Sequence, residues 1–284
     1  MAQFNLHFFK EKSRKIDVDS LISFFERIEG FTIEIDQESV RMNYEHPRLE
    51  YKAKFVITPK SCVPDIYRLS PKFLDLNFHL ELSLLTPYYI ARQVFDIVKR
   101  VCDAYDFHIY NEMLEDVNRF KIELVMKAFE MLKEAYIRKN PVILGDYHRL
   151  PKEKSQAVFR YMDDILELQK YYQELETYVP KYHVLVTEEK ELVFGMEWKE
   201  HTLTVFPPYT DYVFYRVGNE IKVISYQELY PLIEKYVQDV PGFIKGTKVI
   251  SKKMSKKVYK VMKKTKFMKI NHTFAKESIK RLLD

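Results

Sequence analysis

The chain has 284 residues, of which 46% are hydrophobic and 31% charged, so it has enough apolar content for a packed core and is not wholly disordered. Six glycines and two cysteines exclude collagen-like chains and disulfide frameworks. The net charge of +5 is unevenly distributed: residues 245–284 contain 14 Lys and Arg against only Glu277 and Asp284, whereas residues 1–244 carry a net charge of −7.

Strand and helix patterns alternate through residues 1–110. Alternating apolar residues predict strands near residues 4–8, 31–36, 40–44, 49–57 and 74–84, and the last is the most regular. Helical spacing predicts helices over 17–28 and 87–102, followed by a closing strand at 107–110. This is the order of a ferredoxin-like split βαβ with one extra strand, so we predict an α+β fold with a ferredoxin-like N-terminal unit over residues 1–110.

A central helical pair is predicted over residues 111–180. Apolar residues at helical spacing indicate one helix over 113–139, which Asn140 and Pro141 end, and a second over 152–178 with Pro180 just beyond it. These two helices are expected to form a hairpin or to pack on a sheet.

A second small antiparallel-sheet unit is predicted over residues 181–243. Strand patterns recur at 184–186, 192–198, 202–206, 212–217 and 221–224, and a Gly218-Asn219 turn joins the last two as a hairpin. Ser225 to Glu228 matches a capping box that opens a helix through Val237, with a kink or a late start at Pro231.

Residues 244–284 are predicted to form a basic amphipathic tail. Between residues 251 and 269, one side of a helix carries Met254, Val258, Val261, Met262 and Met268. The rest of its surface carries Lys252, Lys253, Lys256, Lys257, Lys260, Lys263 and Lys264. The apolar side predicts that this helix docks on another surface.

Several ligands fit these lysines. They can neutralise nucleic-acid phosphates without sequence specificity, lie on an anionic membrane surface, or bind an acidic partner, including the acidic body of the chain itself. Lysine acts as a point charge, which suits general attraction better than bidentate recognition. The simplest alternative is that the apolar side packs on the body while the lysines only keep the protein in solution.

The polar face of the first sheet is a second candidate. The strand phases place on it His7, Glu34, Asp36, Arg41, Lys52, Lys54, Asp75, His79 and Glu81. The strand aromatics fall in the packed register, which argues against an RNA-recognition surface. No tight ligand spacing supports a metal site at His7, His79 and Glu81, so we predict no metal and no cofactor and interpret the face as an ordinary polar surface.

Three short motifs have simple structural interpretations. Residues 160–165 resemble the Tyr-Met-Asp-Asp box of reverse transcriptases, but they lie in a helical pattern that places Tyr161 and Met162 inward and Asp163 and Asp164 in solvent. The loop at 145–149, where Asp146 and His148 could act as an acid–base pair, is interpreted as a surface turn. Residues 206–212 are interpreted as a rigid Pro-Pro turn rather than a ligand groove.

Two cysteines, no signal-peptide pattern and no apolar run of ~18 residues predict a cytoplasmic protein with no transmembrane segment. The common nucleotide-binding, hydrolase and zinc-protease motifs are absent. We therefore predict a non-enzymatic binding protein that contacts nucleic acid through the Lys-rich helix. The alternatives are a protein–protein or peripheral-membrane adaptor using the same helix, and an enzyme with a site on the polar face of the N-terminal sheet.

Overall fold

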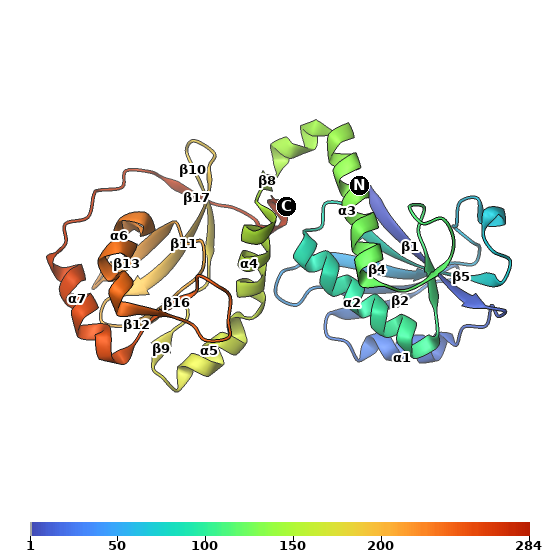
Figure 1. The fold of residues 1–284 in the computed structure, drawn as a ribbon, viewed down its shortest axis with the longest axis horizontal. Helices are drawn as coiled ribbons and strands as arrows, with labels where there is room; N and C mark the ends of the chain where they lie inside the picture. Colours follow the sequence, from blue (N-terminus) through green and yellow to red (C-terminus); the bar gives the residue numbers. More distant parts are fainter. Residues whose placement is uncertain (1) are drawn as a thin grey trace. The chain divides into compact units, whose positions relative to one another are not determined.

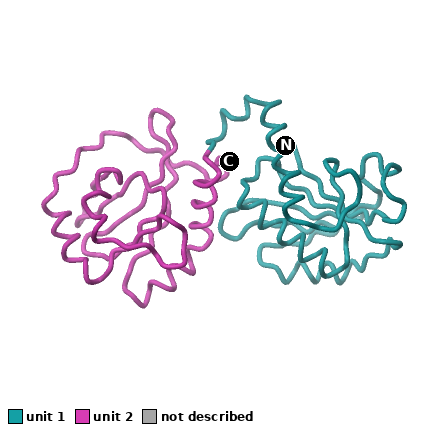
Figure 2. The backbone as a smooth tube through the Cα atoms, in the orientation of Figure 1, with its two compact units in different colours: residues 1–149, 283–284 teal, residues 150–282 magenta. Residues whose placement is uncertain are grey.

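The computed structural model describes residues 2–284, and contacts divide the chain into two compact units (Figure 2). Unit 1 runs to Arg149 and includes Leu283–Asp284, and unit 2 is Leu150–Leu282. Both units combine helices with sheets, which confirms the α+β class (Figure 1). The two helices predicted as a pair belong to different units, the first to unit 1 and the second to unit 2.

Unit 1 is built on one seven-stranded sheet in the order β2-β3-β4-β5-β1-β6-β7. Its elements are β1 (Gln3–Glu11), α1 (Val18–Glu26), β2 (Phe31–Ile35), β3 (Val40–Glu45), β4 (Lys52–Ile57), η1 (Ile66–Arg68), β5 (Phe73–Ser83), α2 (Tyr88–Tyr105), β6 (His108–Tyr110), β7 (Asn118–Arg119), α3 (Ile122–Lys139), η2 (Pro141–Asp146) and β8 (His148–Arg149). Neighbouring strands pair antiparallel throughout this sheet. Helices α1 and α2 are the crossovers, from β1 to the edge strand β2 and from β5 to β6, and β1 lies between β5 and β6.

Local signals explain where these elements begin and end. Asp17 caps α1 by accepting a hydrogen bond from the backbone N–H of Ser20 at 3.0 Å. Gly30 has a φ of +92°, and a Cβ at this position would lie 2.4 Å from the Glu45 carbonyl oxygen, so only glycine fits this turn. Helix α3 begins at Ile122 rather than at residue 113 as predicted, because residues 118–119 pair with β6 as a strand.

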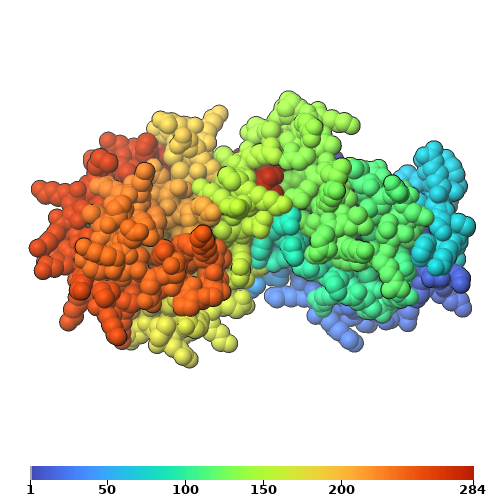
Figure 3. All heavy atoms as spheres, viewed as in Figure 1, coloured from blue at the N-terminus to red at the C-terminus, as the bar shows by residue number. Residues whose placement is uncertain are grey.

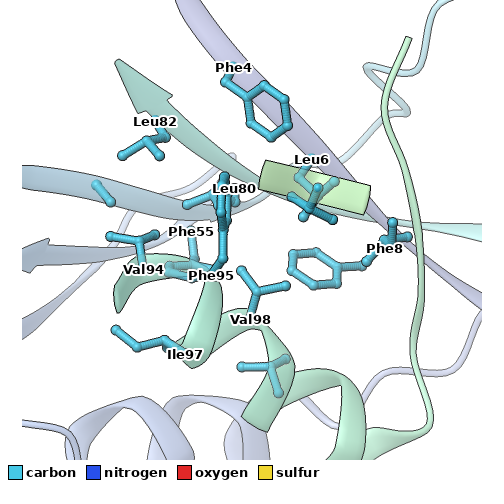
Figure 4. Packing of buried hydrophobic residues seen from close by; sticks show 14 of the residues in the cluster. Phe4, Leu6, Phe8, Phe55, Leu80, Leu82, Val94, Phe95, Ile97 and Val98 are labelled. Carbon is cyan, nitrogen blue, oxygen red and sulfur yellow. The ribbon is translucent and has the colours of Figure 1, made fainter. Parts of the chain in front are cut away.

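Aromatic and aliphatic side chains fill the core between the sheet and its helices (Figure 4). Phe4, Leu6 and Phe8 of β1 are fully buried, and the rings of Phe8 and Phe78 stack with centroids 4.4 Å apart. The apolar stripe of α2 packs on the same side of the sheet, as Val94 and Val98 show in Figure 4. The strict alternation seen in the sequence of β5 therefore does specify which face is packed.

Unit 2 contains two small sheets, in the orders β14-β13-β11-β10-β17 and β15-β16-β12-β9. Its elements are α4 (Lys152–Asp163), α5 (Ile165–Gln173), β9 (Thr177–Tyr178), β10 (His183–Thr187), β11 (Leu192–Lys199), β12 (Leu203–Phe206), β13 (Tyr212–Val217), β14 (Glu220–Ser225), α6 (Tyr226–Ile233), η3 (Glu234–Tyr236), β15 (Val237–Asp239), β16 (Lys248–Ile250), η4 (Lys252–Met254), α7 (Ser255–Lys264), β17 (Phe274–Lys276) and η5 (Ile279–Arg281). The terminal strand β18 (Leu282–Leu283) pairs with β8.

An antiparallel sheet was predicted for this part of the chain, and the sheets of unit 2 are instead mixed, with two parallel strand pairs, β11 with β13 and β9 with β12. Strand β12 leaves the first sheet to join the second, and β13 therefore returns beside β11 in parallel. The predicted helix over 152–178 is also wrong in detail, because Asp164 divides it into α4 and α5. Ser225 does precede α6, yet its side chain makes no capping hydrogen bond.

A buried ion pair holds the last residues of the chain in unit 1. Lys133 Nζ of α3 lies 2.5 Å from Asp284 Oδ1, and both side chains are 4% exposed. The same ammonium donates to the Thr86 carbonyl, and the Asp284 carboxylate accepts from the backbone N–H of Tyr88. Leu283, fully buried beside Ile137 and Leu85, adds an apolar anchor.

Replacing Lys133 with alanine is expected to lower the free energy of unfolding by about 3–5 kcal/mol, because the Asp284 carboxylate is left buried without its cation. The matched control is Lys99→Ala, which removes an exposed ion pair to Asp103 and should cost no more than about 1 kcal/mol. Urea denaturation followed by circular dichroism measures both. Equal costs for the two variants would contradict the structural role of the buried pair.

Candidate functional site

The basic helix α7 is docked on unit 2 by its apolar side. Val258 is fully buried and Met262 is 8% exposed, and both belong to a core that includes Trp198 and Ile224. Helix α7 also lies beside α6 (Figure 1). The predicted docking of this helix is therefore intramolecular, and its apolar stripe is already covered.

Docking leaves the lysine side of this segment in solvent. All seven predicted lysines are exposed. Among residues 2–284, only Lys252 of the seven forms an ion pair. Its Nζ lies 3.2 Å from the Glu176 carboxylate, and both side chains of the pair are largely exposed. The six that carry no ion pair are Lys253, Lys256, Lys257, Lys260, Lys263 and Lys264.

The segment after α7 is extended, so the predicted continuous helix to residue 269 is wrong. The helix ends at Lys264, because the next positions of its apolar stripe are Thr265 and Lys266. Met268, assigned to the stripe from the sequence, is 71% exposed. Its backbone N–H donates to the Glu228 carboxylate, and β17 then adds to the edge of the sheet beside β10.

Residues 245–282, the C-terminal segment of unit 2, form part of its surface, as the dark orange and red atoms show (Figure 3). Unit 2 contains 24 basic and 17 acidic residues, a net charge of +7, although residues 150–244 alone carry −6. Unit 1, with 22 basic and 24 acidic residues, is nearly neutral. The positive charge is therefore concentrated in one unit, and it comes from one segment of the chain.

A groove of about 950 Å³ lies between this segment and the β13–β14 hairpin. Five lysines line it: Lys222 of β14, Lys260 and Lys263 of α7, and Lys266 and Lys269 of the extended segment. Glu200 is the one acidic side chain in its lining. Sequence reasoning missed Lys222, Lys266 and Lys269 as site residues, because the first lies on a distant strand and the other two lie beyond the helix.

The polar face of the sheet in unit 1 is more buried than predicted. Strand pairing places His7 opposite His79, and Lys54 opposite Glu81. Their solvent exposure differs, since His7, His79 and Asp75 are nearly inaccessible while Lys54 is exposed. One reason is that Phe9 packs on this face with residues of the loop after β4, Val63 among them.

His79 links this face into one polar network. Its Nε2 lies 3.3 Å from Glu81 Oε1, and this hydrogen bond is the main cause that lowers the pKa of Glu81. The His7 ring lies 5.5 Å from the His79 ring, and burial, reinforced by His79, lowers the pKa of His7 from 6.5 to about 4. A pocket of about 670 Å³ is lined by His79, Glu81 and Lys54, among other residues.

Two of the short motifs make contacts within unit 2. Tyr161 is fully buried in α4 and donates to the Pro180 carbonyl at 2.8 Å, as expected for an inward residue. Asp163 was predicted to lie in solvent, but it is buried, and it shares the buried side of α4 with Val158 and Phe159. Asp164 pairs with Arg160. At the Pro-Pro turn, Thr210 donates to the Pro207 carbonyl, which closes the turn on itself.

No family model, curated protein or solved structure matches this chain. Across residues 2–284, no three His, Cys, Asp or Glu side chains gather in an arrangement suited to a metal ion. In that same span, no helix combines the length and the apolar character needed to cross a bilayer. The lysine surface of unit 2 and the polar face of unit 1 are the two candidate sites.

Truncating Val258 to alanine is expected to destabilise unit 2 by about 2 kcal/mol, since a fully buried side chain leaves a cavity under α7. Trp198, the only tryptophan, lies in the same core, so its fluorescence during denaturation reports this unit. The neighbouring Lys257→Ala removes only an exposed side chain and should change stability by less than about 0.5 kcal/mol. A Val258→Ala cost as small as this would show that α7 is not docked.

Stability should fall as the pH drops from 6.5 to about 4, in part because of His7. The pKa of His7 in the native state lies below its value in the unfolded state, so the unfolded state binds the proton first and is stabilised relative to the native state as the pH falls through this window. In His7→Gln, the loss of stability between pH 7 and pH 4 should be smaller by about 3 kcal/mol. Denaturant titrations at both pH values measure it. The exposed His272→Gln is the control, and an equal pH dependence in the two variants would refute a buried neutral His7.

Proposed function

We propose that unit 2 binds nucleic acid without sequence preference through the lysines on and beside α7. The observation that carries this proposal is that the apolar side of α7 is buried in its own unit, while six lysines stay exposed and form no ion pair among residues 2–284. A fixed helix that holds several cations in one place is a ready site for a polyanion.

The driving force would be phosphate neutralisation. Each lysine that contacts a phosphate releases condensed counterions, and this gain needs no base-specific contact. Lysines at positions 253, 256, 260 and 263 recur at three- and four-residue spacing, so they share one side of the segment. The role proposed for Lys252 is smaller than for the others, because Glu176 already compensates its charge.

The adaptor alternatives are less well supported. Insertion into a membrane requires the apolar side of an amphipathic helix, and in this protein that side is buried under α7. An acidic protein partner uses the same exposed lysines and is an outcome that the experiments on this surface can detect.

The enzyme alternative rests on His79 and Glu81 of unit 1. Their hydrogen bond and the adjoining pocket could support acid–base chemistry. Cys62 lines the same pocket, but among residues 2–284 its thiol contacts only the Thr58 hydroxyl and the Lys60 carbonyl and forms no hydrogen bond with His79 or Glu81. With no nucleophile hydrogen-bonded to the pair, this alternative is less well supported than the lysine surface.

Two finer predictions belong to the same proposal. We infer that unit 1 is a variant of the ferredoxin-like arrangement, in which β3 and β4 are inserted between β5 and the edge strand β2. This inference is supported by the two helical crossovers, α1 from β1 to β2 and α2 from β5 to β6, and by the position of β1 between β5 and β6. The second of these predictions is a cytoplasmic location. It is supported by the two cysteines, Cys62 and Cys102, which form no disulfide.

Replacing Lys256, Lys260 and Lys263 together with glutamine is expected to weaken DNA binding uniformly across sequences. The slope of log K against log salt should become shallower by about 2–3, since each lost phosphate contact contributes close to one unit. Fluorescence anisotropy with a labelled oligonucleotide at several salt concentrations measures both quantities.

The matched control removes the same charge from unit 1 by replacing three exposed lysines with glutamine. They are Lys121, which precedes α3, and Lys127 and Lys139 within it. These changes should leave the slope nearly unaltered. The proposal fails if wild-type protein does not bind at low salt, or if the control triple lowers the slope as much as the α7 triple.

A further inference from the structure

The groove of unit 2 joins two kinds of side chain that a duplex-binding surface does not need together. One side is cationic, with Lys260, Lys263 and Lys266 following each other along the chain. The other is apolar and comes from the β13–β14 hairpin, where Ile221 is 52% exposed. An exposed apolar wall beside a row of cations marks a ligand with both charge and apolar surface.

The lysines recur regularly along the sequence. They occupy positions 257, 260, 263, 266 and 269, so one charge appears every third residue from the first turn of α7 into the segment that follows the helix. The last four line the groove. A row of this kind matches a ligand whose negative charges are themselves spaced along a chain, rather than a compact anion.

Aromatic rings are present in the same groove. Tyr259 of α7 is half-buried, and its ring packs against the His201 ring with centroids 5.2 Å apart. Phe267, also half-buried, follows in the extended segment, and Tyr215 lies deeper, at 5% exposure. Rings interleaved with lysines are the combination that single-strand binding surfaces use to stack bases while neutralising the backbone.

We propose that this groove holds unpaired bases of a single-stranded nucleic acid, with Tyr259 as a stacking platform and the lysine row on the phosphates. This inference rests on the proposed function and narrows its ligand. A duplex keeps its bases paired and stacked, so it can use the lysines but not the apolar wall. The groove volume of about 950 Å³ falls within the ~300–1,000 Å³ range of sites that enclose small organic groups, which leaves room for a base.

The test compares three labelled ligands with the full-length protein. They are a thymidine oligonucleotide of about 15 nucleotides, an abasic strand with the same number of phosphates, and a duplex of the same length. Anisotropy titrations at one fixed low salt concentration give their affinities. The base-bearing single strand should bind at least about tenfold more tightly than the abasic strand, because only it can stack in the groove.

Variants then locate the effect. Tyr259→Ala should remove about tenfold of the single-strand affinity and leave abasic-strand and duplex binding unchanged, whereas Tyr259→Phe should keep the wild-type preference because it keeps the ring. Tyr171→Ala removes an exposed tyrosine from α5, outside the groove, and serves as the matched control. Trp198 fluorescence during denaturation checks that each variant stays folded.

Each outcome decides something different. Equal binding of all three ligands, with no effect of Tyr259→Ala, overturns base stacking and leaves the electrostatic proposal standing. Binding of none of them overturns both. Tighter binding of poly-glutamate or of anionic phosphatidylserine vesicles than of the thymidine strand, with the same dependence on Tyr259, assigns the groove to an acidic protein or a lipid surface and also overturns this inference. If Tyr259→Ala does not fold, the comparison of base-bearing and abasic strands on the wild-type protein decides alone.

Discussion

The burial of Val258 and Met262 under α7 is the contact on which the functional surface depends. A short helix with this many lysines has little reason to form in water, because like charges at three- and four-residue spacing repel each other. The core of unit 2 supplies the missing stabilisation by covering the apolar stripe. The same contact fixes the direction of the lysines, since a helix with one side buried must present the opposite side to solvent. The burial of the apolar side of α7 and the exposure of its lysines therefore both follow from one amphipathic pattern.

The path of the chain after α7 makes a surface out of this helix. The segment turns extended at Thr265, its backbone donates to Glu228, and β17 joins the edge of the sheet beside β10. Each of these contacts stays within unit 2, so the basic segment is a wall of that unit. The basic segment and the β13–β14 hairpin together line a groove, and a segment that projected freely into solvent would form none. This is why the structure points to a ligand that is partly enclosed as well as electrostatically attracted.

Unit 1 offers a contrast in how charge is handled. Two of its buried or half-buried ionisable pairs lie inside the unit: Lys133 pairs with Asp284, and His79 with Glu81. His7 avoids the cost of burial by staying neutral, which is what its lowered pKa means. Buried and partnered groups stabilise or specify a fold, but they leave little charge for an outside ligand. The lysines of α7 differ, because they are exposed and form no ion pair among residues 2–284.

Much of the secondary structure could be predicted from the sequence, because the apolar patterns of β1, β5 and α2 state directly which face is packed. The sequence also determined that α7 is amphipathic and that positive charge is concentrated near the end of the chain. It could not decide which strands pair, so β12 leaving its sheet and the parallel pairing of β11 with β13 came only with the tertiary structure. The sequence also could not predict that Lys222 and Lys260 line the same groove, or that α7 packs on its own unit. The reason is physical: periodicity records the burial of a face, whereas the identity of the surface that buries it is set by contacts between residues far apart in the chain.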